Sequence, residues 1–461
     1  MSAQGGWCTY LGIVFSMMVL VIFVPTVLLG TIYPYLLKTL EAYGQAPGKT
    51  AGQLAGVNTI GAVAGSLLAS FVLLETLGLW WSIRACALGY CLLALVVSVS
   101  TKKRAARDLL PAAALLFGLL LLPASVPLTV FSAGQHLEAV YEGSAGIVSV
   151  VRTGEVIDLR VDNHLVLGST SPNLLRAHQM LGELPLILHP SAKKVFFLGL
   201  GTCIPAASAL KFPIDSLTAC EIVPGVVRAS REHFAHYIGT LHTDPRAEIV
   251  IEDGRNFLLG TKEKYDLIIS ELFFPWQAGS GQLYSIEHFR TGAERLEEHG
   301  LFVQWIPAGQ FTEPEFASVA ATMLEVFPEL TLWEPLPGFH SWLALVGSKK
   351  GLRLGAEQIE AAARVWQADG VGPGEVRAAF LARYLGNVSG YRQALSSATL
   401  NTDDKPNLEY SAPISQLSVL AGQKSYISAE KLRELSQQLQ RLTPPDKDPV
   451  ISQILAASHA G

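Results

Sequence analysis

The residues best suited to chemistry follow four segments that read as β-strands. Gly199 and Gly201 come directly after the apolar run 194–198, and Glu221 ends the next such run about 20 residues later. Asp253 follows a third run, and Glu271 follows a fourth. The carboxyl ends of parallel strands meet at one edge of an α/β sheet, where such sheets bind their ligands. We therefore expect these five residues around one crevice.

The first three strand ends are typical of a nucleoside site. Glycines after a strand permit close approach of a ligand, and a carboxylate on the next strand can accept hydrogen bonds from both ribose hydroxyls. Asp253, followed by Gly254, is placed to meet an adenine edge. Ile204 stands where a dinucleotide-binding loop has its third glycine, so the loop alone fits a sharp turn equally well. The combination favours a nucleoside pocket over a sharp turn and two unrelated surface acids.

Glu271 is the candidate base. It ends the strand-like segment 265–270 and is followed by Phe273, Phe274 and Trp276. Aromatic neighbours withhold water from a carboxylate, which raises its pKa and makes it a better proton acceptor near neutral pH. The alternative is a glutamate that caps the following loop.

Alternating strands and helices must position these residues. The sequence predicts a β-hairpin from 146–152 and 156–162, joined by Thr153-Gly154-Glu155. Beyond it we expect strands at 194–198, up to 221, and at 247–251, 265–270 and 301–305, with helices at 173–186, 226–236 and 285–300. Such alternation predicts a parallel, doubly wound sheet.

The chain before Glu138 has a different composition. Half of all residues are hydrophobic and 16% are charged, and the apolar excess lies in this first part. Uncharged runs at 10–32, 51–74, after Trp81 to 100, and 109–131 predict about four membrane spans, the last interrupted by prolines. The first run is too long for a signal peptide and lacks a basic segment before it.

We therefore predict a multi-pass protein of the cell (inner) membrane. Lys38 and Lys49 precede the second run, and a basic cluster at 102–107 precedes the fourth, so the positive-inside rule puts both loops in the cytoplasm. Four spans would then leave the globular part outside. Nucleoside chemistry favours the cytosol, and the conflict disappears if 109–131 does not cross. The sequence does not decide which side of the membrane the globular part faces.

Other classes of function are disfavoured. The net charge of −5 without a basic stripe argues against a nucleic-acid partner. The five cysteines show no metal-binding spacing, and His233, His236 and His242 fit a solvated helix better than a metal site, so no metal is expected. The leucines of 428–442 predict an amphipathic tail helix that packs on the domain or on a partner.

With these motifs in place, residues 141–305 resemble the spermidine synthase (polyamine aminopropyltransferase) family. The matching pieces are Tyr141-Glu142, the hairpin, His178, GLGT (199–202), EIVPGVVRASREHF (221–234), DPRAEIVIEDGRNFL (244–258), YDLIISE (265–271) and LYSIEHF (283–289). The segments 25–34, 58–74 and 401–413 are similar to those of the membrane-fused bacterial branch of this family. The resemblance covers most of the chain except its tail.

The resemblance implies a fold and a division into domains. The fold is an α/β Rossmann-like domain of the class I S-adenosylmethionine-type methyltransferase kind, doubly wound, with a preceding β-hairpin region and an N-terminal α-helical transmembrane domain. The expected boundaries are 1–135 for the transmembrane helices, 136–190 for the hairpin and linker, 191–350 for the nucleoside-binding domain and 351–461 for a mainly helical extension.

The resemblance also implies an activity. Decarboxylated S-adenosylmethionine, or S-adenosylmethionine, is the expected cosubstrate, and no tightly bound cofactor is expected. The residues that follow from it are Gly199, Gly201, Thr202, Glu221, Asp253 and Gly254 for the cosubstrate, Glu271 for catalysis, and His178, Tyr284 and Gln310 for the amine. Expected partners are a small-molecule amine, the lipid bilayer, and a homodimer or membrane complex.

Three departures bear on the amine. The family has an aspartate where Thr202 stands, a glutamine where Val166 falls, and a second amine-binding aspartate where Phe274 stands. An unpaired ammonium is costly to desolvate, so an altered amine specificity is expected. Glu313 or Glu315 is the candidate replacement carboxylate. The alternatives are an S-adenosylmethionine-dependent methyltransferase and a catalytically inactive scaffold subunit.

Overall fold

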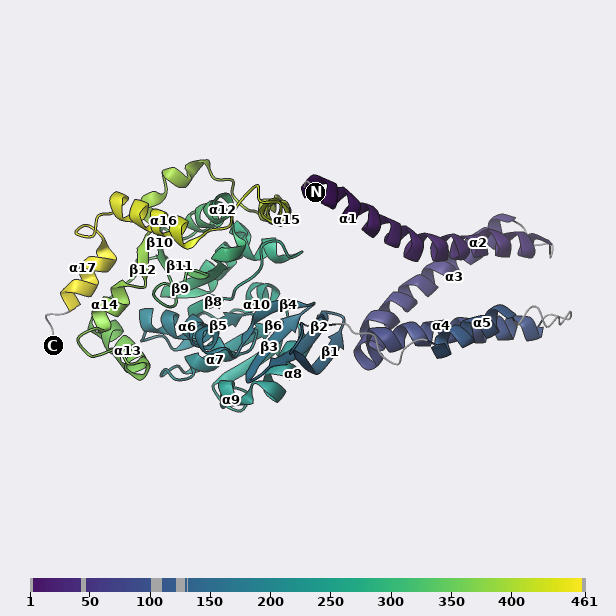
Figure 1. Ribbon diagram of the computed structural model, residues 1–461, viewed down its shortest axis with the longest axis horizontal. Coiled ribbons are helices and arrows are strands. Elements are labelled where there is room, and N and C mark those ends of the chain that lie inside the picture. Colours follow the sequence, from purple (N-terminus) through teal and green to yellow (C-terminus); the bar gives the residue numbers. More distant parts are fainter. Residues whose placement is uncertain (1–2, 43–46, 101–109, 122–128, 131, 458–461) are drawn as a thin grey trace. The chain divides into compact units, whose positions relative to one another are not determined.

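The computed structural model describes residues 3–42, 47–100, 110–121, 129–130 and 132–457 (Figure 1). The chain divides into two compact units, Met1–Val126 and Pro127–Gly461. The domain boundaries at 135, 190 and 350 stay predictions.

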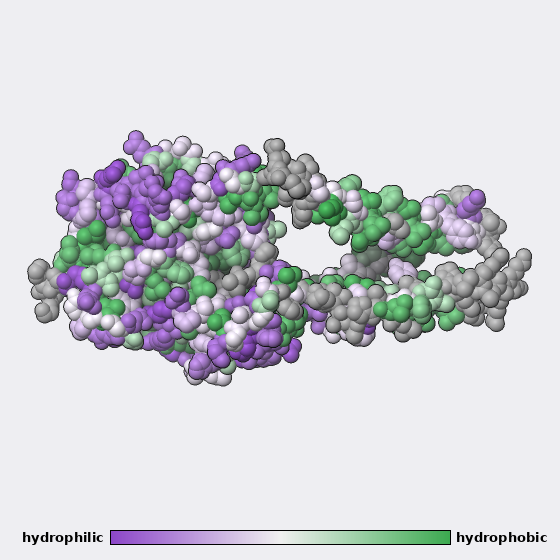
Figure 2. All heavy atoms as spheres, in the orientation of Figure 1, coloured by the Kyte–Doolittle hydropathy of each residue, from purple (hydrophilic) through white to green (hydrophobic). Residues whose placement is uncertain are grey.

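The first unit is helical. Its helices are α1 (Ala3–Met18), α2 (Val24–Ala42), α3 (Pro47–Leu68), α4 (Leu74–Ser100) and α5 (Leu110–Leu121), with π-helical turns at Val19–Phe23 and Ala69–Leu73. Two stretches, Leu11–Leu40 and Gly48–Val97, are long and apolar enough to cross a membrane, and neither is buried. Hydrophobic side chains cover these helices in Figure 2.

The second stretch changes direction at Gly78. This glycine has φ 72° and ψ 176°, which no residue inside an α-helix adopts, so the stretch comprises two helical segments on either side of it. The described part of the run 109–131 is the 12-residue helix α5, too short by itself to cross a bilayer. The rest of that run lies almost wholly outside the described residues, and the number of spans stays a prediction.

The second unit contains two sheets. Strands β1 (His136–Gly143), β2 (Gly146–Thr153), β3 (Val156–Val161) and β4 (His164–Ser169) form an antiparallel meander. The larger sheet consists of β5 (Lys194–Leu198), β6 (Ser216–Glu221), β7 (Ala247–Ile251), β8 (Tyr265–Ser270), β9 (Leu296–Pro307), β10 (Glu329–Trp333), β11 (Trp342–Ser348) and β12 (Tyr384–Asn387). Its order is β12-β10-β11-β9-β8-β5-β6-β7, with β5 to β9 parallel.

Helices cover both faces of the larger sheet (Figure 1). They are α6 (Pro172–Leu188), α7 (Ile204–Ala209), α8 (Pro224–His233), α9 (Ala235–Ile238), α10 (Gly254–Gly260), α11 (Ile286–Arg295), α12 (Glu313–Leu324), α13 (Ala356–Trp366), α14 (Val376–Leu381), α15 (Asn407–Leu420), α16 (Ala429–Leu442) and α17 (Pro449–Ala456). Neighbouring strand residues enter different cores: Phe197 packs in one and Phe196 in the other. This alternation confirms the doubly wound sheet.

Three elements differ from the sequence-based expectation. The predicted hairpin is the centre of a four-stranded meander. The helix predicted to run to residue 300 ends at Arg295, because Leu296 is already the first residue of β9 and pairs with Tyr265 of β8. The extension expected to be mainly helical also contributes β12 to the edge of the large sheet. Strand-pairing partners of this kind lie far away in the sequence, so local patterning misses them.

Candidate functional site

The site lies where the chain order of the large sheet reverses, between β5 and β8. From β5 the chain proceeds outward through β6 and β7, and then returns to β8 on the other side of β5. The Glu271 amide donates to the Leu198 carbonyl at 3.0 Å, which sets the ends of both strands side by side. Gly199 has φ 88°, and a Cβ there would lie 3.2 Å from the Glu271 Cβ. Glycine is therefore required for the carboxylate to approach the loop.

Glu221 supports the glycine loop. Its two carboxylate oxygens accept from the backbone amides of Leu200, at 3.1 Å, and Val223, at 2.9 Å. Burial raises the pKa of Glu221, and bonds from these amides and from that of Gly201 oppose the rise. Each carboxylate oxygen has a second lone pair, which leaves acceptor capacity for ribose hydroxyls. The side chain thus shapes the loop and can still contact a ligand.

Asp253 is the N-cap of α10. Its Oδ1 accepts from the Arg255 amide at 2.8 Å and from the Asn256 amide at 3.3 Å, which leaves Oδ2 for a ligand. Gly254 lies so close to β5 that a Cβ there would meet the Leu198 Cγ at 2.7 Å. The third strand end is therefore packed directly against the first.

Glu271 has the carboxylate of the site with the fewest hydrogen bonds to offset its burial. Its side chain is 1% exposed, and neither oxygen has a hydrogen-bond partner among the described residues. Burial raises its pKa to about 8, with a smaller contribution from the charge of Glu221, while the Leu272 amide opposes the rise. A buried acceptor without a partner suits a ligand that supplies a proton or a positive charge.

The loop after Glu271 is held by two predicted amine-site residues. Tyr284 is fully buried and donates its hydroxyl to the Phe273 carbonyl at 2.7 Å. Gln310 accepts from the Trp276 indole at 3.0 Å, and Trp276 stacks on Phe274 with ring centroids 5.3 Å apart. These contacts give both residues a role in shaping the loop, and their contact with an amine stays a prediction.

His178 lies on α6 and is 1% exposed. Its ring stacks on Trp342, with centroids 4.9 Å apart, and Trp342 pairs with Pro307 at the end of β9. Burial lowers the pKa of His178 to about 4, so the ring is neutral at physiological pH. A neutral imidazole has one donor and one acceptor nitrogen to offer a ligand.

The next residues are those that differ from the family pattern and the two glutamates considered as replacement carboxylates. Thr202 is fully buried behind the glycine loop. Glu313 forms an ion pair with Lys431 at 2.6 Å, and Glu315 accepts from the Thr312 amide at 2.8 Å in a capping box. Both glutamates therefore have structural partners, which weakens the case for either as a replacement carboxylate. The side chain of Val166 lies outside the described residues.

Two residues that contact the site, Gln304 and Glu409, were not identified from the sequence. Gln304 is fully buried in β9 and donates to the Glu271 carbonyl at 3.3 Å and the Trp305 carbonyl at 3.0 Å. A glutamine within the otherwise apolar segment 301–306 was the available signal. Glu409 accepts from the amides of Gly279, at 2.6 Å, and Gly281, at 2.9 Å. The segment 401–413 therefore holds the loop that follows Glu271.

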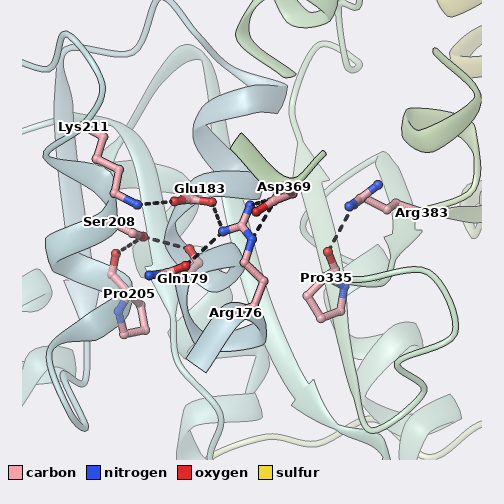
Figure 3. A network of polar contacts seen from close by, with 9 residues as sticks. All are labelled: Arg176, Gln179, Glu183, Pro205, Ser208, Lys211, Pro335, Asp369 and Arg383. Atoms are coloured by element: carbon pink, nitrogen blue, oxygen red, sulfur yellow. Dashed lines mark hydrogen bonds and ion pairs between the residues drawn. The ribbon is translucent and has the colours of Figure 1, made fainter. Parts of the chain in front are cut away.

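An ion-pair network fastens α6, the helix that carries His178 (Figure 3). Arg176 binds Glu183 on the same helix and Asp369, which lies 2.6 Å away, while Lys211 binds Glu183 at 2.8 Å. Glu183 is 1% exposed, so both cations are needed to offset its desolvation. The network ties α6 to the C-terminal extension.

The described part of the chain contains no group of three or more histidine, cysteine, aspartate or glutamate side chains arranged to hold a metal ion. Cys203 and Cys220 are buried, and burial raises the pKa of each thiol to about 12. A cavity of about 580 Å³ lies beside Asp266 and His299, at the opposite end of β8 from Glu271, and includes none of the predicted site residues.

Comparisons with known proteins match the part of the chain that contains these residues. Residues 174–354 match the family model described as "Spermine/spermidine synthase domain". The chain is 26% identical over 208 residues to polyamine aminopropyltransferase 2 of Aquifex aeolicus (strain VF5), which covers 44% of this chain and 42% of that protein. It is 35% identical over 127 residues to the polyamine aminopropyltransferase of Yersinia pestis (strain Pestoides F), which covers 27% of this chain and 43% of the relative.

The spermidine synthase from Thermotoga maritima, a solved structure, is 18% identical, with a TM-score of 0.42 over 62% of this chain and 87% of that one. The matched stretch spans less than half the length of the two curated relatives.

Proposed function

We propose that this chain, whose residues 174–354 match the family model "Spermine/spermidine synthase domain", is a membrane-anchored transferase of the polyamine aminopropyltransferase kind. The observation that carries the proposal is Glu271, a buried carboxylate without a hydrogen-bond partner among the described residues, against the glycine loop at the point where the sheet order reverses. Glu221 and Asp253 provide acceptors at the two adjacent strand ends. A glycine loop at one strand end, acceptors at two others and a base at the fourth are what a reaction of an adenosyl nucleoside with an amine needs.

The cosubstrate is decarboxylated S-adenosylmethionine. Glu221 holds the ribose hydroxyls through its remaining lone pairs, and Asp253 Oδ2 accepts from the adenine amine. The nucleophilic nitrogen attacks the propyl carbon next to the sulfonium. A C–N bond forms, the C–S bond breaks, and its electron pair neutralises the sulfur, so methylthioadenosine leaves. The Glu271 carboxylate orients the amine and accepts its proton, for which a pKa of about 8 is well matched.

The acceptor differs from a classical diamine. The loop beside Glu271 presents the stacked pair Phe274 and Trp276, both partly exposed. An aromatic pair accommodates an apolar body or the face of a cation, whereas a second ammonium deep in the site needs a second carboxylate. We therefore assign an amine with one buried ammonium and a less polar remainder.

Membrane anchoring rests on the two apolar stretches of the first unit. The core helix of a soluble protein is mostly buried, whereas the most apolar 18-residue window of Leu11–Leu40 and that of Gly48–Val97 contain no buried residue. An apolar surface of this length is costly in water and suits the hydrocarbon of a bilayer. The break at Gly78 divides the second stretch into two helical segments, so that one can enter the bilayer and the other can leave it.

The direct test is turnover by the full-length protein in lipid nanodiscs. Decarboxylated S-adenosylmethionine is supplied with a set of monoamines and diamines, and methylthioadenosine release is measured. We expect release with a monoamine, and a loss of about 10²–10⁴-fold in Glu271→Gln, because the amide accepts no proton. Release of S-adenosylhomocysteine from S-adenosylmethionine instead would identify a methyltransferase. If neither nucleoside gives a product, the alternative of a catalytically inactive scaffold remains.

A further inference from the structure

Helix α15 leaves an apolar side exposed in addition to the side that it buries. Tyr410, Ile414 and Leu417 follow one another at spacings of four and three residues, so they share one side of the helix. They are 70%, 62% and 40% exposed, and Leu420 at the end of the helix is 79% exposed. The side packed against the domain contains Leu408, Ala412 and Ser415. A helix on the surface of a soluble domain normally has one apolar stripe, which faces the core, whereas α15 has a second apolar stripe that is exposed.

The exposed face carries no charge. Glu409 is the one carboxylate of α15, and both of its oxygens accept from the backbone amides of the loop at 279–281. Removing this face from water therefore desolvates no free ion. Hydrophobic residues gather on the side of the second unit where α15 lies (Figure 2). A large apolar face of this kind marks an interaction surface.

We infer that this face of α15 docks on the surface of a lipid bilayer. The chain itself brings the bilayer within reach, because roughly 15 residues connect α5 to β1 and extend to at most about 50 Å. Leucine and isoleucine enter the boundary of the acyl region, and the amphipathic ring of Tyr410 suits the headgroup level. The inference rests on the membrane anchoring proposed above, and not on the chemistry of the site.

A second copy of the chain is a poorer occupant. Four partly exposed side chains offer about 400–500 Å², whereas a stable protein interface buries roughly 800 Å² on each partner. A bilayer contact needs less area, because the covalent tether makes it intramolecular and replaces the cost of association by a high effective concentration.

The docked face is connected to the reaction site. Glu409 at the start of α15 holds Gly279 and Gly281, and Asn401 donates to the Gly281 carbonyl at 2.7 Å. The loop that follows Glu271 is thus fastened to the helix that contacts lipid.

Lipid-borne photolabelling of the full-length protein tests the docking. Nanodiscs contain phosphatidylcholine, phosphatidylglycerol and a diazirine-bearing phospholipid, with one protein copy per disc. Peptides are mapped by mass spectrometry after irradiation. Ile222, Ile251 and Leu259 are 57%, 55% and 53% exposed and provide matched controls, because they are apolar and accessible but lie on other elements.

We expect labelling of 407–421 and little labelling of the three controls. In the double variant Ile414→Ser and Leu420→Ser, labelling of this peptide falls about tenfold or more, because full burial of one such side chain is worth about 1.5 kcal/mol or more. Labelling of 407–421 no stronger than that of the controls overturns the inference. If 407–421 escapes labelling only in discs that hold two protein copies, the face contacts a second copy, and this result also overturns the inference. Peptides from 11–40 and 48–97 report on anchoring separately in the same experiment.

Discussion

The substitution Glu271→Gln makes a quantitative prediction about stability. In the folded protein the Glu271 carboxyl keeps its proton up to a pKa of about 8, because it is buried, whereas the unfolded chain releases it near the ordinary value of 4.5. The folded state therefore binds one more proton between these two values, and stability falls as the pH rises through that window. Above pH 8 the folded protein bears the full cost of keeping an ionised carboxylate buried.

The penalty is large for a single side chain. A difference of this size in pKa corresponds to about 5 kcal/mol, and the 1% exposure of Glu271 leaves little solvent screening to reduce it. A neutral amide avoids the penalty. We expect Glu271→Gln to match the native protein at pH 5 and to exceed its free energy of unfolding by several kcal/mol at pH 9.

Urea unfolding of the full-length protein in nanodiscs provides the assay. The fluorescence of the buried tryptophans Trp305, Trp333 and Trp366 reports on the second unit. Glu298→Gln is the matched control, because its side chain is 70% exposed and the same change there leaves the pH profile unaltered. Parallel profiles of the native protein and Glu271→Gln between pH 5 and pH 9 would refute the reasoning, because the carboxylate would then not be desolvated.

Three further substitutions test the supports of the site. Gly254→Ala places a Cβ 2.7 Å from the Leu198 Cγ and should cost about 1–3 kcal/mol in urea unfolding; an unchanged midpoint would contradict the close approach. Glu409→Gln removes the charge that two amides share, so KM for the amine should rise about tenfold while the folding midpoint changes little. Equal KM values would show that the loop needs no such clamp. Arg176→Ala leaves the buried Glu183 with one partner and should cost about 3 kcal/mol at pH 7, whereas a loss below 1 kcal/mol would show that water compensates the charge.

The sequence predicted the parts of the site that depend on local order. A strand that ends in a glycine or a carboxylate delivers that residue to the carboxyl edge of the sheet, so the place of Gly199, Glu221, Asp253 and Glu271 at this edge could be predicted from the sequence, while their roles stay predictions. Their neighbourhood follows from the parallel pairing of β5 with β6 and β8 and of β6 with β7. The aromatic residues after Glu271 likewise predicted a desolvated carboxylate, and its pKa is raised by burial.

The sequence could not predict the contacts that join distant segments. Glu409 lies 130 residues from Gly279 in the loop that it holds, and Asp369 lies 193 residues from Arg176. The partners of Tyr284 and Gln310 are nearer, but a buried tyrosine or an amide looks the same in the sequence whether it binds a ligand or a carbonyl. Which strand pairs with β10 also depends on the whole sheet, so β12 was not anticipated.

The central claim is that four strand ends form one adenosyl-nucleoside pocket, and binding tests it most directly. Isothermal titration of the full-length protein in nanodiscs with decarboxylated S-adenosylmethionine should give one site. The affinity should fall about 10- to 100-fold in Glu221→Ala, because hydrogen bonds to charged groups contribute about 1.5–3 kcal/mol. Binding should persist in Glu271→Gln, which keeps the shape of the pocket. The absence of binding to the native protein, or binding that is undiminished in Glu221→Ala, would contradict the account.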